Sequence, residues 1–160
     1  MAQGIDAGGH VRGKQFLEEL LPQILAAVRM PVLAAGGVAT GERVAELVRA
    51  GADGVRVGTR FVATLESGAH PDYISSLLAA TAADTVVTEW FGEGWENAPH
   101  RVLRSSEDAA RQSGWRATTP PFAGIERPAT DMPMYAGMGV EHVRAVQSAA
   151  EVVRDLTRLL

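Results

Sequence analysis

The chain contains no cysteine among its 160 residues. Disulfide bonds, thiolate nucleophiles and cysteine-based metal sites are therefore excluded. Basic blocks are also missing, and a net charge of −4 at pH 7 gives no footprint for nucleic acid. No apolar run approaches the ~20 residues that a membrane span needs. The polar, Gly-rich start shows no signal-peptide pattern, so we expect a cytoplasmic protein that binds neither nucleic acid nor membrane.

The order of apolar patterns predicts an α/β fold in the first half of the chain. A helical stripe over residues 15–29 precedes a short apolar run at 31–35, which suits a buried parallel strand. Thr40 is a good N-cap for a helix over residues 42–50, and residues 53–57 form the next short strand. Strands that alternate with helices through short loops are typical of α/β proteins.

Later segments have a different character. Helices are expected from Arg60 and over residues 71–82, and then residues 90–135 look irregular, with all three tryptophans and one helical patch at 106–112. Residues 140–160 carry Val and Leu at helical spacing and predict one amphipathic helix. Within the first stripe, Pro22 suits the first turn of a helix that begins near Leu21.

Two glycine-containing turns follow the two expected strands. Gly36-Gly37 end the first apolar run, and Gly58-Thr59 end the second. Each turn taken alone is explained by a tight strand-to-helix connection. Two in tandem favour a phosphate site, because the loops after the last two strands of a (β/α)8 barrel donate backbone N–H groups to phosphate. The hydroxyl of Thr59 adds another donor.

The motif Gly8-Gly9-His10 brings bare backbone and one titratable ring to the same place. Glycine lets the main chain approach a flat ligand closely, and histidine suits proton transfer near neutral pH. A lone histidine is more often a surface or capping residue, but the two glycines and nearby Gln3 make His10 a candidate base. Asp6 and His10 lie on a glycine-rich loop, so we expect no metal site there. The other histidines have no such glycine pair beside them and are expected to be structural: His70, His100 and His142.

Three segments in this order resemble the nitronate monooxygenase family, long called 2-nitropropane dioxygenases. They are Ala-Gln-Gly-x-Asp-Ala-Gly-Gly-His at residues 2–10, Pro-Val-x-Ala-Ala-Gly-Gly at 31–37 and Gly-Ala-x-Gly-Val-x-x-Gly-Thr-Arg-Phe at 51–61. Flavin-dependent enoyl-ACP reductases share much of the pattern. The resemblance implies an FMN-dependent (β/α)8 barrel.

Site residues follow from this resemblance position by position. It implies that His10 is the catalytic histidine, while the expected FMN-binding residues are Gln3, Gly8, Gly9, Gly36, Gly37, Arg56, Val57, Gly58 and Thr59. Three positions depart from the family pattern: Arg56 and Met138 stand where relatives often carry Gln, and Asp6 stands where Glu is commoner.

Family members are roughly twice as long as this chain, and no strand fits in front of the motif at residue 2. The resemblance therefore implies a partial barrel that begins at the tip of the sixth strand. We expect residues 1–88 to form the C-terminal part of an FMN-binding barrel, 89–135 a loop-rich excursion and 136–160 the C-terminal helix. A separate N-terminal half-barrel or a second copy of the chain is an expected partner.

The implied reaction is FMN-dependent oxidation of alkyl nitronates or nitroalkanes by oxygen to a carbonyl compound and nitrite. His10 would abstract the α-proton of a neutral nitroalkane or, as imidazolium, steady an anionic nitronate. An alternative on the same scaffold is an NAD(P)H-dependent reductase of enoyl thioesters or quinones. A third interpretation is a chain that is inactive without a partner half-barrel.

Overall fold

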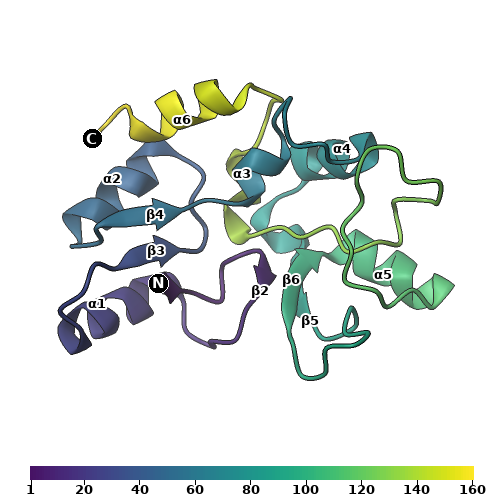
Figure 1. Cartoon of the computed structure of the whole chain (residues 1–160), viewed down its shortest axis with the longest axis horizontal. Helices are drawn as coiled ribbons and strands as arrows, with labels where there is room; N and C mark the ends of the chain where they lie inside the picture. The colour runs from purple at the N-terminus through teal and green to yellow at the C-terminus, as the bar shows by residue number, and fades with distance from the viewer.

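A parallel sheet forms one side of the molecule. The computed structural model describes residues 1–160, and this sheet has the order β1-β3-β4 (Figure 1). Its strands are β1 (Ala2–Gln3), β3 (Leu33–Ala35) and β4 (Gly54–Arg56). Ala2 lies opposite Ala34, and Ala34 lies opposite Val55. These three small apolar residues share one face, which packs on the helices.

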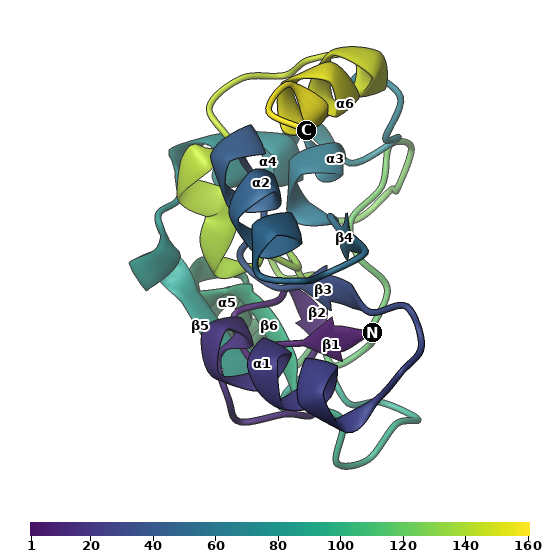
Figure 2. The same ribbon diagram turned by 90° about the vertical axis from the view of Figure 1, so that its left-hand side faces the viewer.

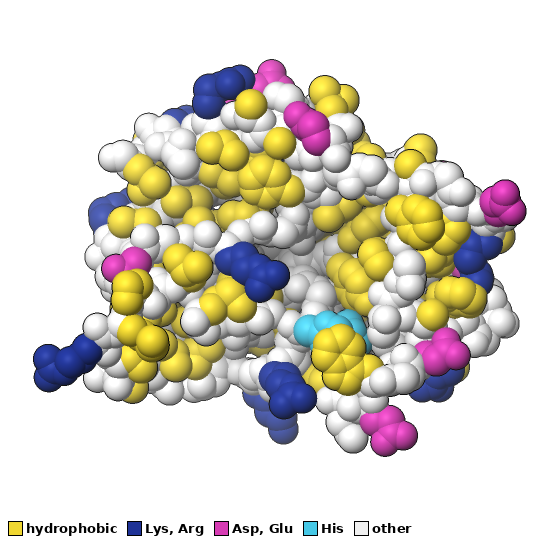
Figure 3. All heavy atoms as spheres, in the orientation of Figure 1, with side chains coloured by type: hydrophobic (Ala, Val, Ile, Leu, Met, Phe, Trp, Pro, Cys, Tyr) yellow, Lys and Arg dark blue, Asp and Glu magenta, His cyan; other side chains and the backbone are white.

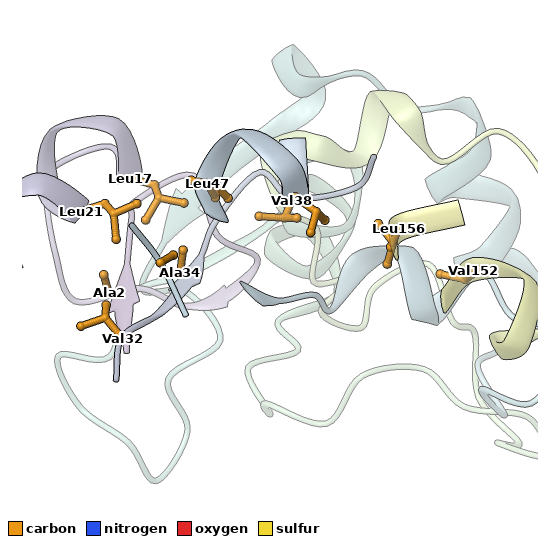
Figure 4. Packing of buried hydrophobic residues seen from close by; sticks show 11 residues of the cluster. Ala2, Leu17, Leu21, Val32, Ala34, Val38, Leu47, Val152 and Leu156 are labelled. Atoms are coloured by element: carbon orange, nitrogen blue, oxygen red, sulfur yellow. The ribbon is translucent and has the colours of Figure 1, made fainter. Parts of the chain in front are cut away.

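Three helices bury that face of the parallel sheet. Helix α1 (Leu17–Ala27) lies between β1 and β3 in the chain, α2 (Gly41–Arg49) links β3 to β4, and α6 (Ala149–Thr157) lies alongside α2 at the opposite end from α1 (Figure 2). Their apolar side chains and Val38, from the loop before α2, belong to the largest core cluster; Figure 4 labels Leu17, Leu21, Val38, Leu47, Val152 and Leu156. The strand–helix alternation of the first half is therefore as the apolar patterns predict.

An antiparallel sheet forms the second side. Its order is β2-β6-β5, from β2 (Gly9–His10), β6 (His100–Leu103) and β5 (Thr85–Thr88). In this register His10 lies opposite His100, and Gly9 lies opposite Arg101. The segment expected to be irregular thus supplies a central strand, and its helical patch forms α5 (Arg104–Ser113).

Short helices connect the two sides. They are α3 (Thr59–Val62), α4 (Pro71–Ala79), η1 (Ala82–Asp84) and η2 (Met138–His142). A second core cluster of Tyr73, Leu77, Leu103, Met134 and Val140, with the smaller Ala80 and Ala136, joins α4, β6 and η2. No helix in the structure is long and apolar enough to span a bilayer.

Two local predictions are wrong. Pro22 lies inside α1 rather than in its first turn. Because Pro22 has no N–H, only the carbonyl of Glu18 loses its helical hydrogen bond. Glu18 is exposed, so water can reach that carbonyl.

The expected single helix over residues 140–160 is the second. Met138–His142 form a 3₁₀ turn, an extended stretch follows, and α6 begins only at Ala149. Ser148 stops any earlier helix, because its side chain accepts from the Glu151 N–H while Glu151 accepts from the Ser148 N–H. As a result, Val152 and Leu156 are buried, whereas Val153 is about half exposed.

Candidate active site

One open cavity of about 680 Å³ collects most of the predicted site residues. Figure 3 shows the hollow in the middle of one face, with a Lys or Arg side chain on one side and a His side chain on the other. The predicted residues that line it are Gln3, Gly8, Gly9, His10, Gly36, Gly37, Arg56, Gly58 and Thr59. Val57 does not line it and packs against the core instead.

The turn after β3 requires glycine at both positions. Gly36 has φ +133° and Gly37 has φ +61°, and a Cβ on Gly36 would lie 2.8 Å from the carboxylate of Asp6. That buried carboxylate also accepts from the Leu17 N–H at 3.1 Å, so Asp6 supports the turn and the start of α1 together. The Gly37 N–H donates to no other backbone group and remains available to a ligand.

The turn after β4 faces open space. A Cβ added to Gly58 would meet no atom within 4 Å, and the Gly58 N–H donates to no other backbone group. Thr59 Oγ1 accepts from the Gly137 N–H at 2.9 Å, which leaves its own O–H free to donate. Together with Gly37, these groups form a set of unused donors at the carboxyl ends of two neighbouring parallel strands.

A close approach of two glycines forms the floor between the sheets. A Cβ on Gly8 would lie 2.6 Å from the backbone nitrogen of Gly137. Gly137 and Gly139 also line the cavity. Sequence reasoning missed both, because they lie far along the chain from the motifs that they contact.

The charge of the lining favours an anion. Arg56 is its only Lys or Arg, and no Asp or Glu contributes to it. The side chain of Arg56 is exposed at the end of β4, near Met1. Gln3 Nε2 donates to the His10 carbonyl at 2.5 Å, and its Oε1 stays available as an acceptor.

His10 lies at the edge of the cavity between two other rings. Its ring centroid is 3.9 Å from that of Trp95 and 3.8 Å from that of His100. His10 Nε2 is buried without a hydrogen-bond partner. Burial, with a smaller contribution from Arg12, lowers the pKa of His10, so the imidazole is neutral and able to accept a proton at neutral pH.

Neither of these two neighbours was among the predicted site residues. His100 is fully buried, and burial together with nearby His10 lowers its pKa to about 4. Tyr135 stacks on the other side of His100 with centroids 5.5 Å apart. No local pattern indicates the contact between His10 and His100, because it depends on the pairing of β2 with β6. The contact between His100 and His10 therefore could not be predicted from the sequence.

The remaining wall is largely apolar and aromatic. Tyr73 and Tyr135 line it with Phe61, Phe122 and the Pro120-Pro121 pair. Tyr73 donates its hydroxyl to the Tyr135 carbonyl at 2.5 Å, and Tyr135 donates to the Thr118 carbonyl at 2.6 Å, so both hydroxyl groups already have acceptors. Such a wall suits a flat apolar ring.

Fold and cavity together define an α/β protein with an enzyme-like site, in which unused backbone donors and an unpartnered imidazole share one cavity. Its family is established by comparison. The family model for nitronate monooxygenase matches residues 1–158, and the chain belongs to this family of oxidoreductases.

Individual relatives agree. The chain is 41% identical over 103 residues to a probable nitronate monooxygenase of Staphylococcus haemolyticus, covering 57% of this chain and 28% of the relative. It superposes on FabK from Thermotoga maritima with a TM-score of 0.78 at 28% identity, over 98% of this chain and 52% of that one. It also superposes on nitroalkane oxidase from Streptomyces ansochromogenes, with a TM-score of 0.75 at 32% identity, over 98% of this chain and 49% of that one. The chain thus spans about half the length of these solved structures, and less of the staphylococcal relative.

Proposed function

We propose that this chain carries the phosphate site and the proton-accepting histidine of an FMN-dependent nitronate monooxygenase. The observation that carries the proposal is the convergence of two donor-rich turns and one unpartnered imidazole on a single cavity. On this proposal, β1, β3 and β4 are the last strands of a (β/α)8 barrel, whose phosphate loops follow its final strands.

The residues present fit FMN. The N–H groups of Gly37 and Gly58 and the hydroxyl of Thr59 would hold its phosphate, since all three are free to donate. The bare backbone at Gly8 would allow a flat ring to approach, and the Gln3 carboxamide would offer an acceptor. Bound FMN would supply the electron acceptor of the reaction.

His10 performs the proton transfer in this proposal. A neutral nitroalkane loses its α-proton to the imidazole of His10, and the C–H electron pair becomes part of the nitronate anion. The imidazolium then stays beside the anion that it has created. A nitronate supplied ready-made needs no such transfer, so His10 acts on it only through charge.

Binding assays with and without the phosphate test the cofactor assignment. We would titrate the purified chain with FMN and with riboflavin, following flavin fluorescence. FMN should bind more tightly, and Thr59→Val should weaken FMN alone, by about tenfold for each ~1.4 kcal/mol of lost contacts. Thr157→Val, at an exposed position of α6, is the matched control. Equal affinity for FMN and riboflavin would contradict the assignment.

A reductase of enoyl thioesters that uses NAD(P)H is the second candidate, favoured by the superposition on FabK. The two candidates differ in what reduces the flavin. Anaerobic bleaching by NAD(P)H without any nitro compound would support the reductase, whereas bleaching by a nitronate alone would support the monooxygenase.

The open face of the parallel sheet motivates a proposal about partners. Leu33 is 46% exposed and Met1 is 57% exposed, although both belong to or adjoin buried parallel strands. Parallel sheets are normally covered on both faces. We propose that further polypeptide, either a half-barrel or a second copy of this chain, covers this face and completes the ring-binding side of the cavity.

A further inference from the structure

The two imidazoles of His10 and His100 form a close, tilted pair at the cavity edge. They are direct cross-strand neighbours in the β2–β6 pairing, so the register itself brings the rings together. Their centroids are 3.8 Å apart, and the ring planes differ by 55°. Trp95 covers the outer side of His10, and Tyr135 stacks against His100. His10 is therefore held by ring contacts on both sides.

The pair has little capacity to hold two protons. His10 Nε2 and both ring nitrogens of His100 are buried without a side-chain hydrogen-bond partner, and the backbone of Ala98 is the one group near His100 that favours its protonation. Burial of an unpaired charge is costly, and two imidazolium rings at this distance repel each other. The only histidine ion pairs in the structure are those of His70 and His142, so no carboxylate offsets a second charge here.

Other charged and titratable groups near the pair do not change this conclusion. Arg12 lies close enough to His10 to disfavour a further positive charge. Arg101 follows His100 on β6 but directs its guanidinium to the Ile5 carbonyl and to Thr85. The Tyr135 hydroxyl donates to the Thr118 carbonyl and does not reach for either imidazole as a donor.

We propose that His100 is a positioning residue for His10: it holds the His10 imidazole by its ring face and limits the pair to one proton, which resides on His10. The role of His10 as the base rests on the proposed function, whereas the contact and its titration do not. When the His10 imidazole takes the α-proton of the nitroalkane, His100 stays neutral. The new imidazolium then rests on a neutral ring instead of beside a second cation.

Histidine titration by NMR tests the coupling without any flavin. We would label the histidines of the chain with ¹³C and follow their Cε1–H signals from about pH 3 to pH 9, around the ordinary histidine pKa of about 6.5. The midpoint of His10 should lie below that value, and that of His100 near 4. In His10→Asn the midpoint of His100 should rise without reaching 6.5, because its burial remains.

Three further variants complete the experiment. His100→Phe keeps a ring against His10 and should leave His10 with a single titration step. His100→Ala removes the ring, so the His10 signals should shift. His142→Phe changes an exposed histidine and should leave both rings of the pair unchanged.

In flavin-loaded enzyme, His100→Ala should lower kcat for a neutral nitroalkane by about tenfold, part of the ~10²–10⁴-fold that a general base contributes. His100→Phe should restore most of that loss. The proposal is overturned if His100 titrates near 6.5, or if its midpoint is the same with and without the His10 imidazole. If the titrations of His10 and His100 are coupled but the enzyme does not turn over nitroalkanes, the proposed function is contradicted and the proposal about His100 is supported.

Discussion

Replacing Gly36 by alanine should destabilise the fold through two separate effects. The φ of +133° belongs to a region that only glycine occupies readily, at a cost of roughly 1–3 kcal/mol for another residue. The added Cβ would also lie 2.8 Å from both carboxylate oxygens of Asp6, and overpacking typically costs about 1–3 kcal/mol. We therefore expect a loss of about 2–6 kcal/mol, a large part of the ~5–15 kcal/mol that stabilises a typical domain.

Two matched glycines separate these effects. Gly9→Ala has the left-handed φ of +76° but no atom near its new Cβ, so it should lose only about 1–2 kcal/mol. Gly58→Ala has neither strain nor clash and should stay within about 0.5 kcal/mol of the parent. It should instead weaken FMN binding, because its methyl group enters the space proposed for the phosphate.

Urea unfolding followed by tryptophan fluorescence measures all three variants. The Asp6→Ala background adds a further test: it removes the clash with residue 36 but not the backbone strain, so Gly36→Ala should cost less there than in the parent chain. The reasoning is refuted if Gly36→Ala matches Gly58→Ala in stability, or if the cost of Gly36→Ala is the same in both backgrounds.

Three other predictions concern the histidine, the pH response and association. In flavin-loaded enzyme, His10→Asn should retain FMN but lose ~10²–10⁴-fold in turnover of a neutral nitroalkane, with a smaller loss on a nitronate, measured as nitrite release; equal losses would argue against a base. Since burial and His10 lower the pKa of His100 to about 4, the unfolded chain binds a proton there that the folded chain does not. The free energy of unfolding should fall by up to about 3 kcal/mol between about pH 6.5 and pH 4, and by clearly less in His100→Phe, as urea titrations at several pH values would show. Finally, the chain should associate in sedimentation experiments, and Leu33→Lys on the open face should reduce association; monomers in both cases would contradict an uncovered interface.

The two glycine-containing turns of the site could be predicted from the sequence, because each is marked by the residues next to it in the chain. An apolar run that ends in glycine marks the carboxyl end of a buried parallel strand, and both such runs form β3 and β4 in the structure. Turns at the carboxyl ends of neighbouring parallel strands meet at one edge of the sheet. Gly37 and Gly58 therefore come together without any further information.

The ring contacts of His10 could not be predicted, because they depend on strand pairing between distant parts of the chain. β2 has two residues, too few for an alternating pattern, and its partner β6 lies far along the chain. Only the tertiary pairing decides that His10 meets His100 rather than another residue. The split of the C-terminal helix is different, because the capping box Ser148-Ala-Ala-Glu151 is a local signal in the sequence for a helix that begins at Ala149.

The segment between β1 and β2 connects the glycine-containing turns with the ring contacts of His10. The Ile5 carbonyl accepts from Arg101 Nε at 2.8 Å, which ties the segment to β6 in the antiparallel sheet. The neighbouring Asp6 accepts from the Leu17 N–H through its side chain and from the Met138 N–H, at 2.9 Å, through its carbonyl. Its carboxylate also lies under the Gly36 turn. A substitution at Asp6 should therefore disturb the phosphate turn and the distance from that turn to His10 together. This makes Asp6 a residue whose effect on catalysis would arise without any contact with the reacting atoms.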